Sequence, residues 1–408
     1  MSTNQKPSRR KLLKSALAGS GVLAASGACF LVKRDREVQG SFVDRSHLVG
    51  HRIRDGASSV KPRETVQVPI VVVGGGIAGL SAAWRLEKLG FREFVLLELE
   101  EQVGGNSRWG ESEAGDFPWG AHYIPVPDKK IPLVHELFEE LGVLRDGRWD
   151  KRHVCPEPQQ RLFVNGHWQP EIEASDDARR IDRDQFKRFW DRMDYFRSGD
   201  EFAIPIRPPT RTATLDRISM KSWMIREGFF SPYLRWYVDY GCRDDYGASY
   251  GDTSAWAGVH YFAARPEDEP GPLTWPQGNG WVVKQLLGKL GKYARTSSAV
   301  HRIEPDGRRL RVLTDNKEYS AECVIFAAPT FLAPYLMPHR RTDLVPAQRF
   351  AYSPWLTAKL VLDELPREGR LGPAWENIIY DSPGLGYVVA NHPLAAGTQG
   401  PLVWTYYR

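Results

Sequence analysis

The chain has 408 residues, of which 42% are hydrophobic and 12% aromatic, so two domains and a large buried core are expected. Its formal net charge is +5, but residues 1–28 hold five cations and no acid, so the remainder is balanced and nothing indicates a nucleic-acid partner. The three cysteines beyond residue 29 are scattered without CxxC spacing, which argues against a zinc site or a disulfide framework.

The first 32 residues have the architecture of an export signal. Basic residues precede an apolar run of small residues, 15–32, that is broken by glycines. Arg9 and Arg10 resemble the twin-arginine motif, with Leu12 where Phe is commoner, and this implies delivery by the twin-arginine export machinery to the periplasm or the outer side of a membrane. Residues 15–32 could instead remain as an anchor, and Cys29 could carry a lipid. A coincidental arginine pair on an ordinary signal is the alternative.

A strand, a tight turn and a helix are predicted between residues 69 and 90. A run of β-branched residues meets three glycines at G-x-G-x-x-G spacing, and helix-period apolar residues follow. The first glycine permits a sharp turn, the second lets a pyrophosphate approach the backbone, and the third lets helix and strand pack closely. The helix N-terminus would then face the phosphates. The candidate cofactor contacts here are Gly74, Gly76, Ile77, Ala78 and Gly79.

A second strand, residues 93–98, ends in a carboxylate. Glu98 follows Gly79 by 19 residues, close to the roughly 20-residue spacing of an acid that binds a ribose hydroxyl. Strand, glycines, helix, strand and acid therefore occur in the order of a dinucleotide-binding unit. The plain structural alternative is a glycine-rich turn beside an exposed glutamate.

Two more glycine-rich segments follow, at residues 102–109 and 117–123. Together with the preceding unit they resemble the FAD-dependent amine oxidoreductases, which include monoamine and polyamine oxidases and, more distantly, carotenoid desaturases. The resemblance implies that Gly104 and Gly105 lie against the FAD phosphates. The family usually has an arginine directly after this pair, whereas this chain has Asn106 there and Arg108 two places on, so Arg108 is the candidate phosphate contact.

The second of these segments matches the place where the family's backbone passes the flavin ring. The resemblance therefore implies that Gly120 and Ala121 contact FAD. His122 could face the flavin or the substrate, although a single histidine is more often a structural hydrogen-bonding residue.

Residues 131–265 are predicted to be helical and aromatic. Apolar stripes at 133–141 and 186–196 are most simply core, and Asn165-Gly166 between apolar runs predicts a hairpin. The cluster Asp239, Asp244 and Asp245 lacks a histidine at ligand spacing and an EF-hand pattern, so a solvated or capping role is expected and no metal site.

The chain then returns to the dinucleotide unit. Residues 275–281 resemble the family's Pro-x-Gly-x-Gly segment, and 299–329 its three-strand return, where Val300 would hold the adenine side through its backbone. Residues 353–363 resemble the strand on which amine oxidases carry a lysine near flavin N5. Lys359 is therefore a catalytic candidate, together with His122, and an edge-strand surface lysine is the alternative.

These observations predict an α/β fold in which a mixed α/β substrate domain interrupts a Rossmann-like FAD-binding domain. The family's final glycine-rich turn, which closes over the flavin, has no counterpart before residue 408. We expect the chain to divide into a signal or anchor (1–32), a linker (33–65), an FAD-binding domain (66–125 and 269–330) and a substrate domain (126–268 and 331–408).

The expected activity is oxidation of a small-molecule amine by hydride transfer to flavin N5, with O₂ or another acceptor reoxidising the flavin. No base is required if the amine arrives neutral, and the spacing suggests no histidine–carboxylate pair. Three alternatives stay open. They are a flavin-dependent desaturase or isomerase of a long apolar substrate, an NAD-dependent dehydrogenase, and an exported protein whose FAD fold only binds a partner. Substrate identity and oligomeric state are not predicted.

Overall fold

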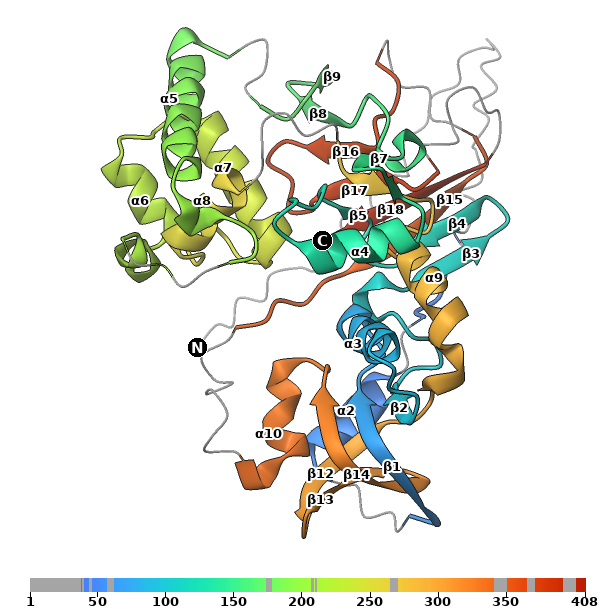
Figure 1. Ribbon diagram of the computed structural model, residues 1–408. Coiled ribbons are helices and arrows are strands. Elements are labelled where there is room, and N and C mark those ends of the chain that lie inside the picture. Colours follow the sequence, from blue (N-terminus) through green and yellow to red (C-terminus); the bar gives the residue numbers. More distant parts are fainter. Residues whose placement is uncertain are drawn as a thin grey trace, which may run out of the picture. The chain divides into compact units, whose positions relative to one another are not determined.

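The computed structural model describes residues 38, 40–43, 46–56, 62–173, 178–206, 209, 211–264, 271–340, 351–364, 371–391 and 401–408 (Figure 1). Two units are distinguished, Met1–Arg45 and Ser46–Arg408, and every feature below belongs to the second. The predicted export signal, the anchor at residues 15–32 and Cys29 lie outside the described residues. Among the helices that are described, none is long and apolar enough to cross a membrane.

A six-stranded sheet contains the predicted dinucleotide unit. Its central strands are parallel, and a three-stranded antiparallel return forms one side of it. The last three residues of the central strand are buried, as expected for a parallel strand covered on both faces. In order across the sheet the strands are β11 (Ala294–Arg295), β2 (Phe94–Leu97), β1 (Glu64–Val73), β14 (Lys317–Phe326), β13 (Arg309–Thr314) and β12 (Val300–Asp306).

Helices cover both faces of this first sheet. Because side chains alternate along a strand, Val72 packs into the core on one face, whereas Val71 and Val73 pack into the core on the other. The first face is covered by α3 (Ile77–Lys88), α4 (Pro132–Glu140) and α9 (Gly280–Leu290), and the second by α2 (His47–Arg54) and α10 (Ala333–Leu336).

α2 falls within residues 33–65, for which the sequence predicts an irregular linker. It forms a helix because Val49 and Ile53 are four residues apart on one face and pack into the core of the sheet. The wider division into FAD-binding and substrate domains stays a prediction.

A second six-stranded sheet is almost wholly antiparallel. The exception is the parallel pair β16 and β8, which joins segments more than 200 residues apart in the chain. The hairpin predicted at Asn165-Gly166 is confirmed, with both residues at positive φ. In order across the sheet the strands are β15 (Thr357–Leu362), β18 (Leu402–Tyr407), β17 (Gly386–Val389), β16 (Glu376–Ile379), β8 (Gln160–Val164) and β9 (His167–Pro170).

Four helices form a separate hydrophobic cluster, seen together in Figure 1. The stripe predicted at residues 186–196 is confirmed as core, since Phe189 and Met193 have no exposed surface. Serine side chains cap three of these helices, at Ser219, Ser231 and Ser254. The helices are α5 (Arg180–Arg197), α6 (Met220–Arg226), α7 (Pro232–Tyr246) and α8 (Ala255–Ala263).

Short elements connect these parts. The paired strands are β3 (Trp109–Ser112) with β4 (Gly115–Pro118), β5 (Tyr123–Ile124) with β10 (Leu273–Thr274), and β6 (Leu144–Arg145) with β7 (Arg148–Trp149). Single 3₁₀ turns lie at Gly105–Ser107, Lys151–His153, Asp200–Phe202, Ala213–Arg217, Gly291–Tyr293, Thr330–Leu332 and Pro338–Arg340.

Candidate active site

The three glycines between β1 and α3 differ in what surrounds them. Gly74 has a φ of +107°, and a Cβ there would lie 2.8 Å from the Ala327 carbonyl oxygen. A Cβ on Gly79 would lie 1.8 Å from the Gly74 carbonyl oxygen, so helix and strand are in direct backbone contact. A Cβ on Gly76 would meet only Gly105 Cα, at 4.0 Å. Gly74 and Gly79 are therefore required by the fold, whereas Gly76 leaves open space beside the turn.

The amino end of α3 presents unpaired donors to this space. The first hydrogen bond of the helix runs from Leu80 N–H to the Gly76 carbonyl, and Gly76 supplies no side-chain cap. The amides of Ala78 and Gly79 have no acceptor among the described residues. Together with the helix dipole, these donors favour an anion such as a pyrophosphate.

The second glycine turn lies against the first. Gly104 N–H donates to the Gly75 carbonyl at 2.8 Å, and a Cβ on Gly105 would lie 3.3 Å from Gly76 Cα. Gly104 and Gly105 both have positive φ, at +124° and +55°. The two turns thus form a groove lined by bare backbone, which fits a dinucleotide phosphate pair.

Glu98 follows β2 at the edge of this groove, as the spacing predicts. Its Oε2 accepts from Gly75 N–H at 2.6 Å and its Oε1 from Glu100 N–H at 2.9 Å. The residue is only 8% exposed, and burial raises the pKa of its carboxyl above the ordinary value. The Glu98 carbonyl accepts from Ser298 N–H at 2.7 Å, which brings the start of β12 and Val300 to the same edge. These groups fit the adenosine half of a dinucleotide.

The segment 118–123, here called the carbonyl turn, is held through its main chain. A Cβ on Gly120 would lie 2.5 Å from the Asn106 carbonyl oxygen, so only glycine fits this approach. The oxygens of Gly120 and His122 accept hydrogen bonds from Tyr407 Oη, at 2.8 Å, and from Thr274 Oγ1, at 2.9 Å. Further bonds to the carbonyl turn run from Lys359 Nζ to Pro118 O, from Asn279 N to Ala121 O and from Asn279 Nδ2 to Tyr123 O.

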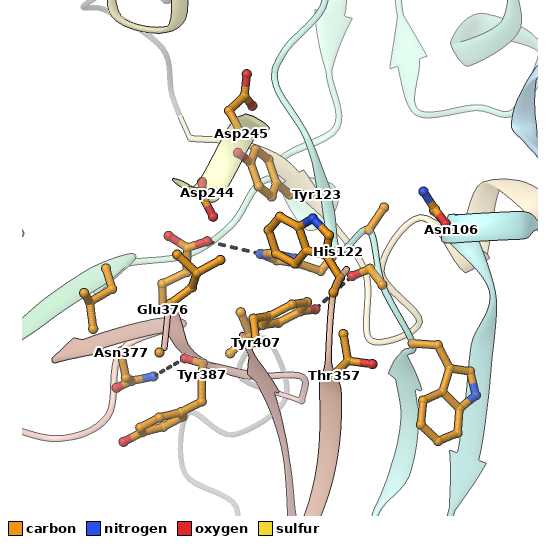
Figure 2. Close-up of a pocket in the computed structure, with 18 of the residues that line it drawn as sticks. Asn106, His122, Tyr123, Asp244, Asp245, Thr357, Glu376, Asn377, Tyr387 and Tyr407 are labelled. Atoms are coloured by element: carbon orange, nitrogen blue, oxygen red, sulfur yellow. Dashed lines mark hydrogen bonds and ion pairs between the residues drawn. The ribbon is translucent and has the colours of Figure 1, made fainter. Parts of the chain in front are cut away.

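A cavity of about 620 Å³ opens between the carbonyl turn and the second sheet (Figure 2). Gly105, Asn106 and Arg108 line its end nearest the glycine groove. The opposite wall comes from β16, β17 and β18, and residues of α7 and of the segment 353–357 complete the lining. The volume falls within the usual range for a small-molecule site.

Five predicted site residues share this cavity: Gly105, Arg108, Gly120, Ala121 and His122. Gly74, Gly76, Ile77, Ala78, Gly79 and Gly104 form the adjoining groove, and Glu98 and Val300 lie at its far edge. Arg108 lies 3.6 Å from Glu100 in an ion pair, so its guanidinium is held by a carboxylate at the cavity mouth. Its role as a phosphate contact stays a prediction.

Lys359 lies behind the cavity wall and is not among its lining residues. Its side-chain nitrogen Nζ donates to Pro118 O and Thr405 Oγ1 and lies 4.3 Å from the centre of the Phe117 ring. Burial lowers the pKa of Lys359 from 10.5 to about 6, so it is neutral at pH 7. Thr357, on the same face of β15, is the residue of this strand that lines the cavity.

A histidine–carboxylate pair faces the cavity, although none was expected. His122 Nε2 lies 3.1 Å from Glu376 Oε1, and the two side chains are 15% and 17% exposed. Glu376, Tyr407 and Thr357 are among the lining residues that were not predicted as site residues. Glu376 is 254 residues from His122, and no local spacing could have signalled the pair.

The aspartate cluster divides between two roles. Asp239 lies within α7, is bound to Arg243 at 3.1 Å and accepts from Tyr250 N–H in the segment after the helix, so it is neither a helix cap nor a free solvated group. Asp244 and Asp245 line the cavity (Figure 2). No cluster of ligands for a metal ion occurs within the described part of the chain.

The chain is similar in sequence to a known domain family and to known proteins. Residues 72–141 match the NAD(P)-binding Rossmann-like domain. A Dictyostelium discoideum protein described as "Probable flavin-containing monoamine oxidase A" is 23% identical over 67% of this chain and 61% of its own length. A Mycobacterium tuberculosis protein described as "Putative flavin-containing monoamine oxidase AofH" is 26% identical over 64% of this chain and 57% of its own length. The match thus spans about three-fifths of the length of these relatives.

Solved structures share the fold. A double mutant of putrescine oxidase superposes with a TM-score of 0.66 at 17% identity, over 84% of this chain and 76% of that one. The predicted α/β fold with a Rossmann-like domain is therefore confirmed. In sequence and in fold, the chain is similar to the flavin-dependent amine oxidases.

Proposed function

We propose that the chain binds FAD and oxidises a small amine. The observation that carries this proposal is the continuity of two features: the backbone groove of Gly76, Gly104 and Gly105 adjoins a cavity that ends at an aromatic and acidic wall. The relatives described as flavin-containing monoamine oxidases and the fold of putrescine oxidase support it.

The residues fit FAD in the order that the sequence suggests. The amides of Ala78 and Gly79 and the bare groove would hold the pyrophosphate, and Glu98 would exchange one of its backbone partners for a ribose hydroxyl. Gly120 and Ala121 would lie along the ring system. Bound FAD supplies the acceptor for a hydride from the carbon beside the amine nitrogen, and O₂ or another acceptor reoxidises it.

The cavity wall favours a cationic substrate with apolar parts. Glu376, Asp244 and Asp245 place carboxylates along it, while Tyr123 and Tyr407 contribute aromatic surface. A carboxylate attracts an ammonium group in a partly desolvated site more strongly than in water, and aromatic faces add to that attraction. These residues therefore support an amine over a neutral polyene.

The first test is the visible spectrum of the purified full chain, taken before and after acid precipitation. We expect flavin absorbance that an anaerobic panel of amines bleaches and that carotenoid polyenes leave unchanged. Bleaching by polyenes alone would instead establish a desaturase. A colourless protein would favour the reading in which the fold only binds a partner.

A matched pair of glycine variants ties the flavin to the groove. Gly76 has an ordinary extended backbone and open space, so Gly76→Leu should fold and still exclude the pyrophosphate. Gly288, exposed on α9 with no atom within 4 Å of an added Cβ, is the control. We expect loss of flavin absorbance in Gly76→Leu and retention in Gly288→Leu. Retention in both would contradict the proposed site.

We propose further that the chain is exported through the twin-arginine machinery and acts in the periplasm or on the outer side of a membrane. The support is the sequence alone, where Arg9 and Arg10 precede the apolar run 15–32. In cell fractionation, replacing both arginines by lysine should hold the full chain in the cytoplasm. Unchanged export of that variant would contradict this route.

A further inference from the structure

His122 and Glu376 form a hydrogen-bonded pair of ionisable side chains on the cavity wall. Glu376 lies on β16 and bonds through both carboxylate oxygens: Oε1 to His122 Nε2 at 3.1 Å, and Oε2 to Gln160 Nε2 at 2.9 Å. Gln160 is the register partner of Glu376 on the parallel strand β8. The sheet itself therefore sets the position of this carboxylate behind the imidazole.

This arrangement selects the tautomer of His122. An ionised carboxylate only accepts hydrogen bonds, so His122 Nε2 must carry the proton that it donates to Glu376. Nδ1 then holds the lone pair of the neutral ring. Nδ1 has no hydrogen-bond partner among the described residues, and it is not one of the enclosed atoms that lack one. His122 lines the cavity, and 15% of its side chain is exposed, so the ring edge that carries Nδ1 is the one left for a molecule bound there.

The imidazole is also held in place. Its ring centre lies 5.0 Å from that of Tyr123, 5.3 Å from Trp375 and 5.1 Å from Tyr407. Its backbone is fixed by the bond from Thr274 and by Gly278, where an added Cβ would lie 2.8 Å from His122 Cα. Figure 2 shows the ring between Tyr407 and the Glu376 carboxylate. The geometry is that of a histidine oriented by an acid on one side and open to a reactant on the other.

Few other groups near the pair titrate around neutral pH. Burial raises the pKa values of Tyr407 and Tyr240 well above the neutral range, and it does the same for the Cys155 thiol. Asp244 and Asp245 face the cavity from α7, and Tyr123 from β5. Lys359, behind the wall, titrates near pH 6 and has to be controlled for in any test.

We propose that Glu376 positions His122 so that Nδ1 accepts the ammonium proton of an amine in the cavity. The N–H bond of the ammonium breaks, its electron pair stays on the amine nitrogen, and the proton forms a new N–H bond at Nδ1. The products are a neutral amine, whose lone pair assists loss of hydride from the adjacent carbon, and an imidazolium stabilised by Glu376. The inference rests on the proposed function, and it names His122 as a catalytic residue and Glu376 as a positioning residue.

A binding measurement tests this without turnover. The probe 2-phenylpropan-2-amine has no C–H bond on the carbon beside its nitrogen, so it cannot be oxidised, and the alcohol of the same shape is the neutral control. Because the ammonium and a solvent proton compete for Nδ1, calorimetric affinity for the amine should weaken as the pH falls, by up to tenfold per pH unit once Nδ1 is protonated in the free protein. This weakening of amine affinity at low pH should disappear in His122→Asn and remain in Lys359→Met. If it persists in His122→Asn, the proposal is overturned.

The role of Glu376 is tested on the histidine itself. In NMR spectra of protein labelled with ¹⁵N-histidine, the His122 signals should show the proton on Nε2. These signals are identified because they are lost in His122→Asn and retained in His167→Asn. In Glu376→Gln the imidazolium loses the opposite charge behind it, so the pH below which amine affinity weakens should move lower. Glu376→Asp, which keeps the charge, should move it part of the way back. An unchanged pH dependence of amine affinity in Glu376→Gln would overturn the positioning role.

The same samples separate this inference from the proposed function. The flavin spectrum reports the cofactor, whereas the pH dependence of amine affinity and the His122 signals report the proton acceptor. If the protein is colourless but its affinity for the probe amine still weakens at low pH, the proposed oxidation is contradicted and His122 remains the proton acceptor. If the protein binds flavin that amines reduce, but its affinity for the probe does not weaken at low pH, the proposed function stands and this inference is overturned.

Discussion

The two sheets build their parts of the candidate site in different ways. Around the first sheet the site is built from backbone, at Gly74 and Gly79 after β1 and at Gly120 in the carbonyl turn, where the chain approaches itself too closely for a Cβ. The second sheet does so with side chains from β16, β17 and β18, which line the cavity without sharing any local motif. A backbone-built site is sensitive to a single added methyl group, whereas a side-chain-built site depends on hydrogen bonds and charge.

The largest expected effect is in the first sheet. In Gly79→Ala the new methyl carbon would lie 1.8 Å from the Gly74 carbonyl oxygen, so strand and helix must separate. We expect a loss of more than about 4 kcal/mol in the free energy of unfolding, measured with urea. The control Gly288→Ala, on the exposed side of α9, should stabilise by up to about 1 kcal/mol. Equal changes in the free energy of unfolding at the two positions would contradict the claim that this part of the site depends on close backbone contact.

In the second sheet the strongest effect should come from Arg161, a fully buried cation. Its guanidinium donates to the carbonyls of Leu371 and Gly372 and to Tyr387 Oη, and it stacks 3.8 Å from the Trp168 ring centre. Arg161→Met should cost about 2–4 kcal/mol, because these acceptors would lose their donors inside the protein. Urea unfolding of Arg161→Lys should give an intermediate value, since lysine lacks the planar fork. A neutral Arg161→Met would show that the sheet does not depend on this network.

Lys359 should give a pH-dependent effect. Its pKa is about 6 in the folded chain and near 10.5 when unfolded, so the unfolded chain binds the extra proton and the lysine destabilises the fold as pH falls. This penalty is absent above pH 10.5 and complete below about 6. The stability of Lys359→Met relative to wild type should therefore rise on going from pH 10 to pH 6, by at most ~1.4 kcal/mol per pH unit. Parallel stability curves would contradict the burial of this amine.

The smallest expected effect is at the contact between the two regions. Tyr407→Phe removes one hydrogen bond, from Tyr407 Oη to Gly120 O at 2.8 Å, and leaves the ring in place. We expect a loss of about 1 kcal/mol in urea unfolding. Flavin absorbance should be retained, because the remaining bonds still hold the carbonyl turn. Loss of flavin in this variant would show that the second sheet, too, shapes the cofactor groove.

The same contrast explains what could be predicted from sequence. The strand–glycine–helix unit and the Asn165-Gly166 hairpin were predicted because the backbone geometry demands glycine, or a residue that tolerates positive φ, at particular positions, and Glu98 was predicted from its spacing after that unit. Glu376 could not be predicted, because pairing of β16 with β8 alone brings it to Gln160 and His122. The alternation of side chains along a strand predicts that Lys359 and Thr357 share one face of β15. It does not predict that Thr357 lines the cavity and Lys359 does not.

The carbonyl turn has a consequence for engineering of the cavity. Five of its six residues are anchored through carbonyl oxygens, which every amino acid possesses, so the anchoring depends on side-chain identity only at Gly120, where a Cβ would clash. Trp119 and Tyr123 line the cavity from this segment. A saturation library at these two positions should thus sample new cavity shapes while the scaffold persists, which makes the turn a natural starting point for redirecting substrate preference.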